Sequence, residues 1–450
     1  MGVSKNYTSG PIGSVIIRTA LSMLPGTLAI SGYNIVDTYF VAQLGVIPLA
    51  AMGYTFPVVM LIGCLYRGLD NGMLTPAAQA LGGNKLNRAR SLISSGIILL
   101  TCVSLIVGVV GMFTIEPVFK LLKANHEVMG DIRNYMAIWY LGSVTGALSM
   151  ASNSLLVTAG VPRLAGLMML GGLVLNAVLD PLFIFGWGWF PAMGVAGAAL
   201  ATIIAQTVGM CVSLAILHCK LHLIGSFLMP LKIIAGYWKT IFRYGIPAAC
   251  AMLLVPIGSM VVTYGVTAVG GNDAVAAVAA AGRVEMVAFV FPMSLGMTLL
   301  PMIGQNYGAK QWDRINSIRR FAMRFAEIML ILMAVIYFVF ARQIAAFFTD
   351  DAEVAAIMIE YLRLVPWGFA GIEVHRFGGF FLTACARPFG AAVLNGGRVA
   401  FLLIPLTLIA VFFESLTGIF IARLATDIIA GVAGLICARW ITRGHLTGGK

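Results

Sequence analysis

Uncharged, mostly apolar blocks recur along the whole chain, and short segments between them hold most of the charged residues. A helix of about 20 residues crosses roughly 30 Å of hydrocarbon, so each block is long enough to span a bilayer. A transmembrane barrel would instead show segments of about ten residues that alternate apolar and polar positions. The pattern predicts about twelve membrane-spanning helices. Their expected ranges are 14–42, 47–76, 90–114, 132–152, 164–185, 194–217, 240–268, 276–302, 318–345, 354–381, 393–413 and 417–440.

Composition and charge agree with this pattern. Apolar types make up 60% of the 450 residues and charged types only 10%, whereas a soluble domain has roughly 25% charged residues. The net charge of +12 comes from lysines and arginines that gather in alternate connections, for example at 85–90 and 310–320. This distribution follows the positive-inside rule, so it indicates topology and not nucleic-acid binding. The seven cysteines are scattered and odd in number, which predicts packing residues without a disulfide framework.

The two halves of the sequence resemble each other. Gln79 matches Gln305 at an offset of 226, and Pro181 matches Pro405 at an offset of 224. Six helices per half is an even number, so both halves enter the membrane from the same side, as parallel repeats about an axis along the membrane normal. We therefore predict an all-α integral membrane protein with two six-helix lobes. The expected boundaries are 1–217 for the N-terminal lobe, 218–239 for a cytoplasmic linker and 240–450 for the C-terminal lobe.

Asp37 and Asp180 each stand alone inside a long apolar run. A charged group near the bilayer centre costs about 2.5–3.5 kcal/mol on insertion scales, so it usually faces a cavity and has a function. In the repeat, Asp37 corresponds to Val262 and Asp180 corresponds to Ile404. Because only the first copy carries the acids, a functional role is favoured over a role in holding the fold together.

Polar residues accompany the two aspartates. Asn176 lies four residues before Asp180, on the same helix face. If the expected helices one, four, five and six enclose one cavity, the acids would share a poorly solvated site that holds a proton near neutral pH. An oxygen-rich site suits sodium equally well, and helix–helix hydrogen bonding is the structural alternative. The predicted ion-coupling residues are Asp37, Asn176, Asp180 and Thr202, which are also the predicted ligands if the ion is sodium.

A second set of residues is predicted to line a substrate cavity. Its members are Tyr33, Asn34, Asn153, Glu285, Glu373 and His375. A self-contained polar cluster explains Glu373 and His375 equally well. Arg67 and Asp70 are three residues apart on one helix, which favours a local ion pair.

Five motifs occur in order over essentially the whole chain: YNIVDTYFVAQLG, NSLLVTAGVPR, NAVLDPLFIFG, GVAGAALAT and GRVEMVAFVFPMSLGMTLLPMIGQNYGA. Together they resemble the multidrug and toxic compound extrusion (MATE) family, and within it the DinF-like branch. The resemblance implies that Asp37 and Asp180 couple transport to protons. The chain departs from the NorM-like branch, since PIGSMVVTYGV carries no acid and the acid of helix ten is replaced near Gly371. A second-lobe sodium site of that type is therefore not expected.

We thus expect a secondary active antiporter that exports amphipathic, mostly cationic drugs or toxins by alternating access, in exchange for protons or sodium; the substrate class is what the resemblance implies. The alternative is a flippase for a lipid-linked oligosaccharide or another lipid, which would need an arginine cluster in the cavity. No enzyme is expected, because neither HExxH nor GxSxG occurs.

No cofactor is expected beyond the proton or sodium gradient. No metal site is predicted either, since the best-spaced pair, His218 and His222, lacks an acidic third ligand. The expected partners are small-molecule substrates and the lipid bilayer, without nucleic acid. We expect a monomer in the plasma (inner) membrane with both termini in the cytoplasm.

Overall fold

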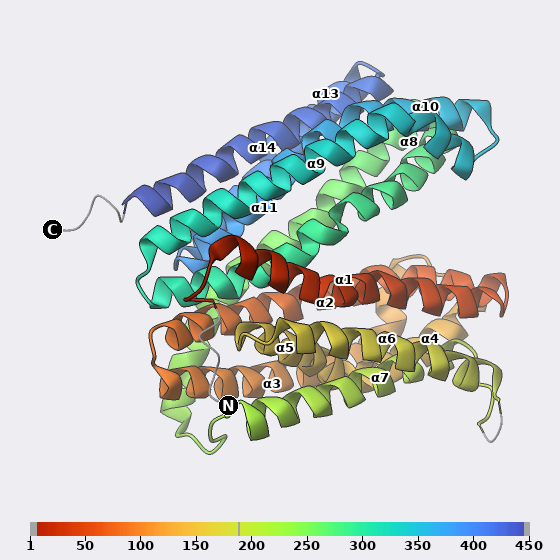
Figure 1. The fold of residues 1–450 in the computed structure, drawn as a ribbon. Helices are drawn as coiled ribbons and strands as arrows, with labels where there is room; N and C mark the ends of the chain where they lie inside the picture. The colour runs from red at the N-terminus through yellow and green to blue at the C-terminus, as the bar shows by residue number, and fades with distance from the viewer. Residues whose placement is uncertain (1–6, 188–189, 445–450) are drawn as a thin grey trace. The chain divides into compact units, whose positions relative to one another are not determined.

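The computed structural model describes residues 7–187 and 190–444, except for the side chains of Ser31, Asn34 and Arg443. Every regular element in these residues is a helix (Figure 1). Ten helices are long and apolar enough to cross a membrane. One of them is a 78-residue helix that is interrupted by non-helical backbone at Gly271, so it supplies two crossings. Two consecutive 16-residue helices supply another. The predicted all-α membrane fold of about twelve crossings is confirmed.

The described residues form two compact units, and the first consists of Leu21–Ala249. Its elements are the later part of α1 (Ile12–Ala42), α2 (Val46–Gly82), α3 (Leu86–Leu121), α4 (His126–Leu141), α5 (Ser143–Thr158), α6 (Pro162–Phe185), α7 (Val195–Ala215), the π-helix η1 (Ile216–Lys220) and the start of α8 (Leu231–Gly308).

The second unit consists of Tyr7–Ala20 and residues 250–444. Its elements are the first turns of α1, the remainder of α8, α9 (Trp312–Phe348), α10 (Ala352–Leu364), the 3-10 helix η2 (Val365–Gly368), α11 (Phe369–Ala384), α12 (Pro388–Gly397), the π-helix η3 (Arg398–Leu403), α13 (Ile404–Phe412) and α14 (Leu416–Gly444).

The start of α1 is fastened within the second unit by hydrogen bonds from α8 and α9. The Asn306 side-chain amide donates to the carbonyl oxygen of Tyr7 at 2.9 Å. The Arg314 guanidinium donates to the carbonyl oxygens of Tyr7 and Gly10, at 3.1 and 2.8 Å. The Ser294 hydroxyl donates to the carbonyl oxygen of Ala20. One continuous helix therefore has its first turns in one unit and its remainder in the other.

The internal repeat is visible in the backbone as well as in the sequence. Three pairs of residues with left-handed backbone lie 226 positions apart: Gly45 and Gly271, Asn84 and Lys310, and Gly160 and Ala386. At this offset the counterpart of Asp37 is Thr263 and not Val262, a shift of one residue from the sequence alignment. Neither side chain can ionise at physiological pH, so the asymmetry between the two copies remains.

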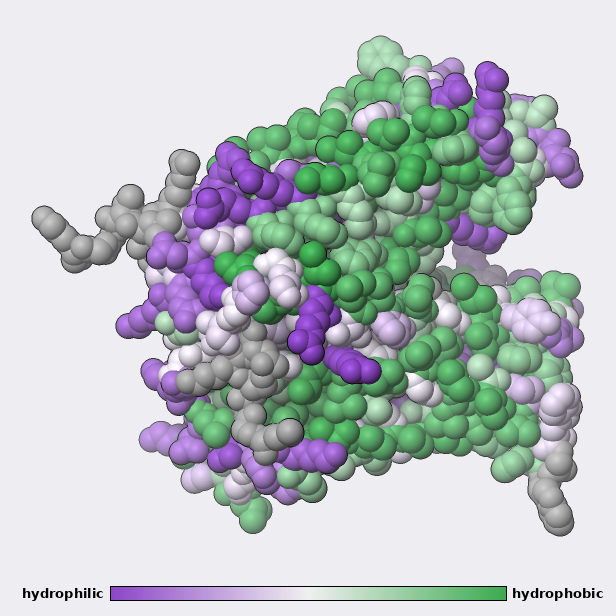
Figure 2. All heavy atoms as spheres, in the orientation of Figure 1, coloured by the Kyte–Doolittle hydropathy of each residue, from purple (hydrophilic) through white to green (hydrophobic). Residues whose placement is uncertain are grey.

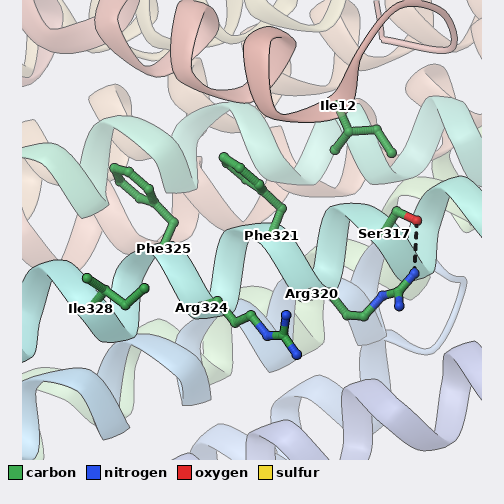
Figure 3. Close-up of a pocket in the computed structure, with 7 residues that line it drawn as sticks. All are labelled: Ile12, Ser317, Arg320, Phe321, Arg324, Phe325 and Ile328. Carbon is green, nitrogen blue, oxygen red and sulfur yellow. Dashed lines mark hydrogen bonds between the residues drawn. The ribbon is translucent and has the colours of Figure 1, made fainter.

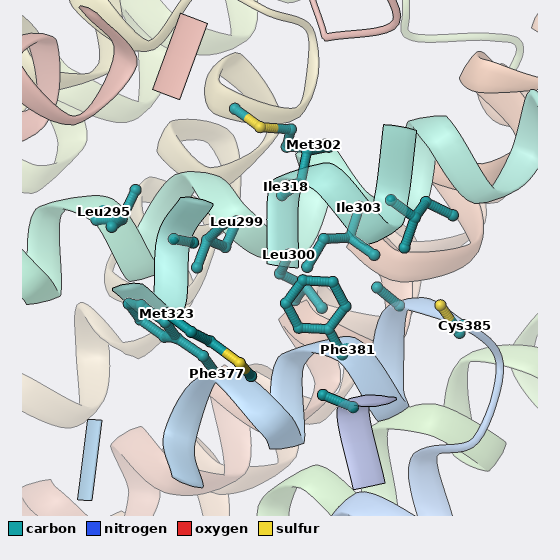
Figure 4. Packing of buried hydrophobic residues seen from close by; sticks show 14 of the residues in the cluster. Leu295, Leu299, Leu300, Met302, Ile303, Ile318, Met323, Phe377, Phe381 and Cys385 are labelled. Atoms are coloured by element: carbon teal, nitrogen blue, oxygen red, sulfur yellow. The ribbon is translucent and has the colours of Figure 1, made fainter. Parts of the chain in front are cut away.

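In each unit, apolar side chains cover the middle of the helices, and hydrophilic ones gather toward helix ends (Figure 2). Large side chains such as Phe113 and Phe401 remain mostly exposed, as suits contact with lipid. Inside the second unit, Leu299 of α8, Met323 of α9 and Phe377 of α11 pack in a shared core (Figure 4). Lipid-facing and core surfaces are thus both apolar, and the buried polar groups mark the exceptions.

Candidate ion-coupling site

The α1 and α6 helices of the first unit approach closely because glycine leaves room for the neighbouring backbone. A Cβ atom at Gly166 would lie 2.4 Å from the carbonyl oxygen of Ser22. Farther along the same pair, a Cβ atom at Gly172 would lie 2.5 Å from the Tyr33 hydroxyl. Residue numbers rise together along both helices, so α1 and α6 run in the same direction. The following turns bring the two aspartates together.

The α7 helix is held against α6 in a similar way. A Cβ atom at Gly197 would lie 2.5 Å from the carbonyl oxygen of Phe183, so the first turn of α7 packs against backbone near the end of α6. Thr202 lies five residues further along α7 and reaches Asn176 of α6. Three helices therefore contribute to one polar site.

A chain of hydrogen bonds joins the two carboxylates. The Asn176 Nδ2 group donates to Asp180 Oδ1 and to Thr202 Oγ1, each at 3.2 Å. The Thr202 hydroxyl in turn donates to Asp37 Oδ2 at 3.5 Å. Asn176 and Asp180 are fully buried, and Asp37 and Thr202 are half-buried. The carboxylates are also close enough for direct electrostatic interaction.

The unused atoms of this site are all acceptors. Asn176 donates its amide hydrogens to Asp180 and Thr202, and Thr202 donates its only hydroxyl hydrogen to Asp37. Asp37 Oδ1, Asp180 Oδ2 and Asn176 Oδ1 are buried and have no hydrogen-bond partner among the described residues. Buried polar atoms are rarely left unpaired, so such a set calls for protons or a cation. These four side chains can therefore bind positive charge, and none of the four has a free donor for an anion.

Aromatic and apolar side chains surround the carboxylates. Tyr33 of α1 and Tyr135 of α4 both interact electrostatically with Asp37 and Asp180. One turn beyond the acids, Val41, Ile184 and Ala198 belong to one apolar cluster that also includes Val195. Sequence reasoning missed Tyr135, because nothing in its local pattern distinguishes it from an ordinary packing tyrosine.

Other first-unit predictions fare differently. The side chain of Asn34 is not among those that the structure describes. Asn153 of α5 is half-buried, and its Oδ1 atom has no partner among the described residues, so it does not join the chain between the acids. Arg67 is exposed and Asp70 is buried. No salt bridge joins them in the described part of the protein, so the expected ion pair is wrong.

Glu285, Glu373 and His375 belong to the second unit, whereas the four residues above belong to the first. Glu285 of α8 accepts from Arg423 of α14 at 2.5 Å and from the Tyr361 hydroxyl of α10 at 2.8 Å. Arg423 also lies 4.0 Å from Asp427, which is fully buried. Glu285 is thus one member of a network of acidic and basic side chains that the sequence analysis did not identify.

Asp427 is the largest omission of the sequence analysis. Its Oδ1 atom accepts from Arg398 Nη2 at 2.6 Å, and Arg398 opens the π-helix η3. Its position in ARLATDIIAG, a carboxylate among apolar residues, is the same signal that identified Asp37. Two carboxylates and two guanidinium groups make this network electrically neutral.

Glu373 and His375 of α11 are also paired locally. Glu373 binds Arg376 at 2.6 Å. The ring nitrogens of His375 lie 3.2 Å from the carbonyl oxygen of Ala430 and 3.1 Å from Asn395 Oδ1. Both residues are buried, which agrees with a self-contained polar cluster, the structural alternative for this pair.

Similarity to known proteins covers nearly the whole chain. The chain is 29% identical over 425 residues to a FAD transporter of Shewanella oneidensis, with 94% of each chain aligned. It is 23% identical over 448 residues to the multidrug export protein MepA of Staphylococcus aureus, covering 98% of this chain and 96% of MepA. The crystal structure of the Vibrio cholerae MATE transporter VcmN in the bent form superposes with a TM-score of 0.90 at 29% identity, over 98% of this chain and 99% of that one.

The family model MatE matches residues 24–182 and 247–409, so it covers the positions of both acids and of their counterparts in the second repeat. The match, the shared fold and the relatives that transport small molecules agree with one another. The protein is a transporter and not an enzyme, and it belongs to the MATE family.

Proposed function

We propose that this protein is a DinF-like MATE antiporter that exports amphipathic, mostly cationic organic compounds in exchange for protons. Asp37 and Asp180 bind the coupling protons, while Asn176 and Thr202 link the two aspartates through hydrogen bonds. The observation that carries the proposal is the set of three unpaired acceptor oxygens on a buried hydrogen-bond chain. A monomer in the plasma membrane with both termini in the cytoplasm completes the proposal.

Competition for the same carboxylates explains exchange. An ionised pair of carboxylates favours a cationic substrate, because an uncompensated charge in a dry site is unfavourable. Protonation removes that charge and converts a carboxylate oxygen into a hydrogen-bond donor. A proton and a cationic substrate therefore displace each other, as antiport requires.

Conformational change in α1 completes the proposed cycle. Pro25 lies inside this helix, where proline removes a backbone hydrogen bond and permits bending. The ionised Asp37 carboxylate can only accept the hydrogen bond from Thr202. Once protonated, Asp37 is neutral and can accept or donate, so the hydrogen bond between α1 and α7 weakens. One charge that moves across 100 mV supplies about 2.3 kcal/mol, equivalent to roughly a fortyfold gradient.

The oxygen atoms of this site also allow sodium as the coupling ion, since carboxylate, amide and hydroxyl oxygens are ligands for hard cations.

Two experiments test the proposal. In cells, Asp37→Asn and Asp180→Asn should each abolish energy-dependent ethidium efflux; unchanged efflux in either variant would reject the coupling role. In proteoliposomes, a proton gradient should drive uptake and a sodium gradient at equal pH should not.

A second candidate substrate class is a flavin dinucleotide, because the relative from Shewanella oneidensis is a FAD transporter. Arg398 and Arg423 of the second unit are half-buried, and either guanidinium could bind a phosphate if its carboxylate partner moved away. Uptake of FAD into everted vesicles discriminates the two classes. FAD uptake that Arg423→Gln abolishes, without an effect on ethidium, would favour the dinucleotide.

A further inference from the structure

A pocket outside the proposed transport site lies on the second unit, on the early part of α9. It encloses about 430 Å³ and combines two arginines with four large apolar side chains (Figure 3). It is lined by Ile12, Ser317, Arg320, Phe321, Arg324, Phe325 and Ile328. The mixture of charge and apolar surface suits an amphipathic ligand.

Arg320 and Arg324 are exposed and one helical turn apart, and Figure 3 shows them leaving α9 on the same side. Neither guanidinium forms a salt bridge in the part of the chain that the structure describes. Arg320 donates a long hydrogen bond of 3.4 Å to Ser317. Glu327 interacts electrostatically with Arg324 but is shared with Arg439. The pocket thus presents two cationic groups with free donors.

The position of these arginines along α9 places them at the membrane surface. From Arg324 to the next basic residue, Arg342, there are 18 residues, or about 27 Å of helix. The hydrocarbon layer is roughly 30 Å thick, so the two arginines mark its opposite boundaries. The positive-inside pattern predicts that the start of α9 is cytoplasmic. Arg320 and Arg324 then lie at the level of the lipid phosphates of the cytoplasmic leaflet.

The rest of the pocket is built for hydrocarbon. The rings of Phe321 and Phe325 are stacked, with centroids 6.0 Å apart, and Figure 3 shows both pointing toward the side of Ile12. Ile328 is 70% exposed, and Leu332 one turn further is 58% exposed. An apolar track therefore leads from the arginines toward the membrane interior.

We propose that this pocket binds an anionic phospholipid of the cytoplasmic leaflet. Arg320 and Arg324 bind the phosphate of a lipid whose headgroup carries no ammonium group to neutralise it, and the first part of an acyl chain lies along Phe325 and Ile328. Basic pockets beside membrane helices on the cytoplasmic side recognise lipids through this combination of charge and hydrocarbon.

Lipid binding in this pocket would stabilise the first turns of α1. Ile12 is the first residue of α1 and lines the pocket. A Cβ atom at Gly13 would lie 2.9 Å from the Phe321 ring, so the two helices are in close contact at this point. A bound lipid that packs on Ile12 and Phe321 therefore adds to the hydrogen bonds that fasten the start of the helix.

Native mass spectrometry of the purified full-length protein tests the proposal, with phosphatidylglycerol and phosphatidylcholine as probes. Each arginine near the membrane surface contributes about a fivefold affinity for anionic lipid. Arg320→Gln or Arg324→Gln should therefore weaken phosphatidylglycerol binding about fivefold, and the double variant about 25-fold. Phosphatidylcholine binding should stay within twofold.

Two controls make the result specific. Arg342→Gln removes an exposed arginine from the opposite end of the same helix and should leave phosphatidylglycerol binding unchanged. The double substitution to lysine keeps both charges and should retain most of the affinity. Equal losses for Arg342→Gln, equal losses of both lipids, or displacement of the lipid by millimolar inorganic phosphate would each overturn the proposal.

Discussion

The close approach of α1 to α6 is the feature on which the geometry of the acids depends. Gly166→Ala would place a Cβ atom 2.4 Å from the carbonyl oxygen of Ser22, whereas ordinary van der Waals contact begins at 3.4 Å. The helices must therefore separate by about 1 Å at this crossing, and overpacking of this kind costs about 1–3 kcal/mol. The Thr202–Asp37 hydrogen bond is already 3.5 Å long, so an added displacement of α1 breaks it.

Gly171→Ala is the matched control. It lies on the same helix, but nothing lies within 4 Å of the Cβ position. Alanine is the better helix former, so this variant should be as stable as the original protein or slightly more stable. Both variants are tested by ethidium efflux per amount of folded transporter, counted by size-exclusion chromatography, and by thermal unfolding in detergent.

We expect Gly166→Ala to lower efflux about tenfold or more, because misplacement of interacting groups by about 1 Å can cost up to a hundredfold in rate. Gly171→Ala should be unchanged. Equal efflux from the two variants would refute the idea that the α1–α6 contact sets the position of the acids. A loss that appears in both would point to helix α6 flexibility instead.

Three further predictions concern other parts of the molecule. Thr202→Val keeps the shape of the side chain but removes the hydrogen-bonded link between Asn176 and Asp37. Efflux should fall, while the free energy of unfolding, followed by thermal unfolding, should change by no more than about 1–3 kcal/mol. Unaltered efflux would show that the link is dispensable. Arg398→Gln leaves the buried Asp427 without its closest partner and should destabilise the protein by about 3–5 kcal/mol, whereas adding Asp427→Asn should restore most of the loss, as thermal unfolding can measure. Burial raises the pKa of the Cys385 thiol to about 12, so a maleimide at pH 8 should not modify it, and rapid labelling in a variant that keeps only this cysteine would contradict its packing in the core.

The sequence was informative where a lone polar residue stands against an apolar background. Asp37 and Asp180 were identified in this way, and the helical spacing of Asn176 supplied one neighbour. The structure brings these residues and Thr202 into one hydrogen-bond chain. Their role in transport stays a prediction.

Other features depend on contacts between distant segments. Tyr135 approaches the acids only through the packing of α4, and the first turns of α1 join the second unit through backbone carbonyls that carry no sequence signal. The network around Asp427 was detectable, because Arg423 and Asp427 are four residues apart in an apolar run. In the first copy of the repeat, the counterparts of Arg423 and Asp427 are the apolar residues Ala199 and Ile203. Each unit therefore has a polar cluster that the other copy lacks.

The neutral second-unit network also explains why the acids there differ chemically from the first pair. Glu285 and Asp427 each have an arginine within 2.6 Å, whereas Asp37 and Asp180 have no basic residue within salt-bridge distance among the described residues. A carboxylate that is already paired gains little from a proton or a metal cation. Ion coupling is therefore expected in the first unit.

Proton release on substrate binding tests this account most directly. Purified protein in weakly buffered detergent solution, mixed with ethidium near neutral pH, should release protons in proportion to the substrate bound. The release should disappear in the Asp37→Asn, Asp180→Asn double variant, in which the exchangeable carboxylates are gone. Substrate binding without any proton release in the original protein, or release that persists in the double variant, would contradict the proposal that these two aspartates exchange protons for substrate.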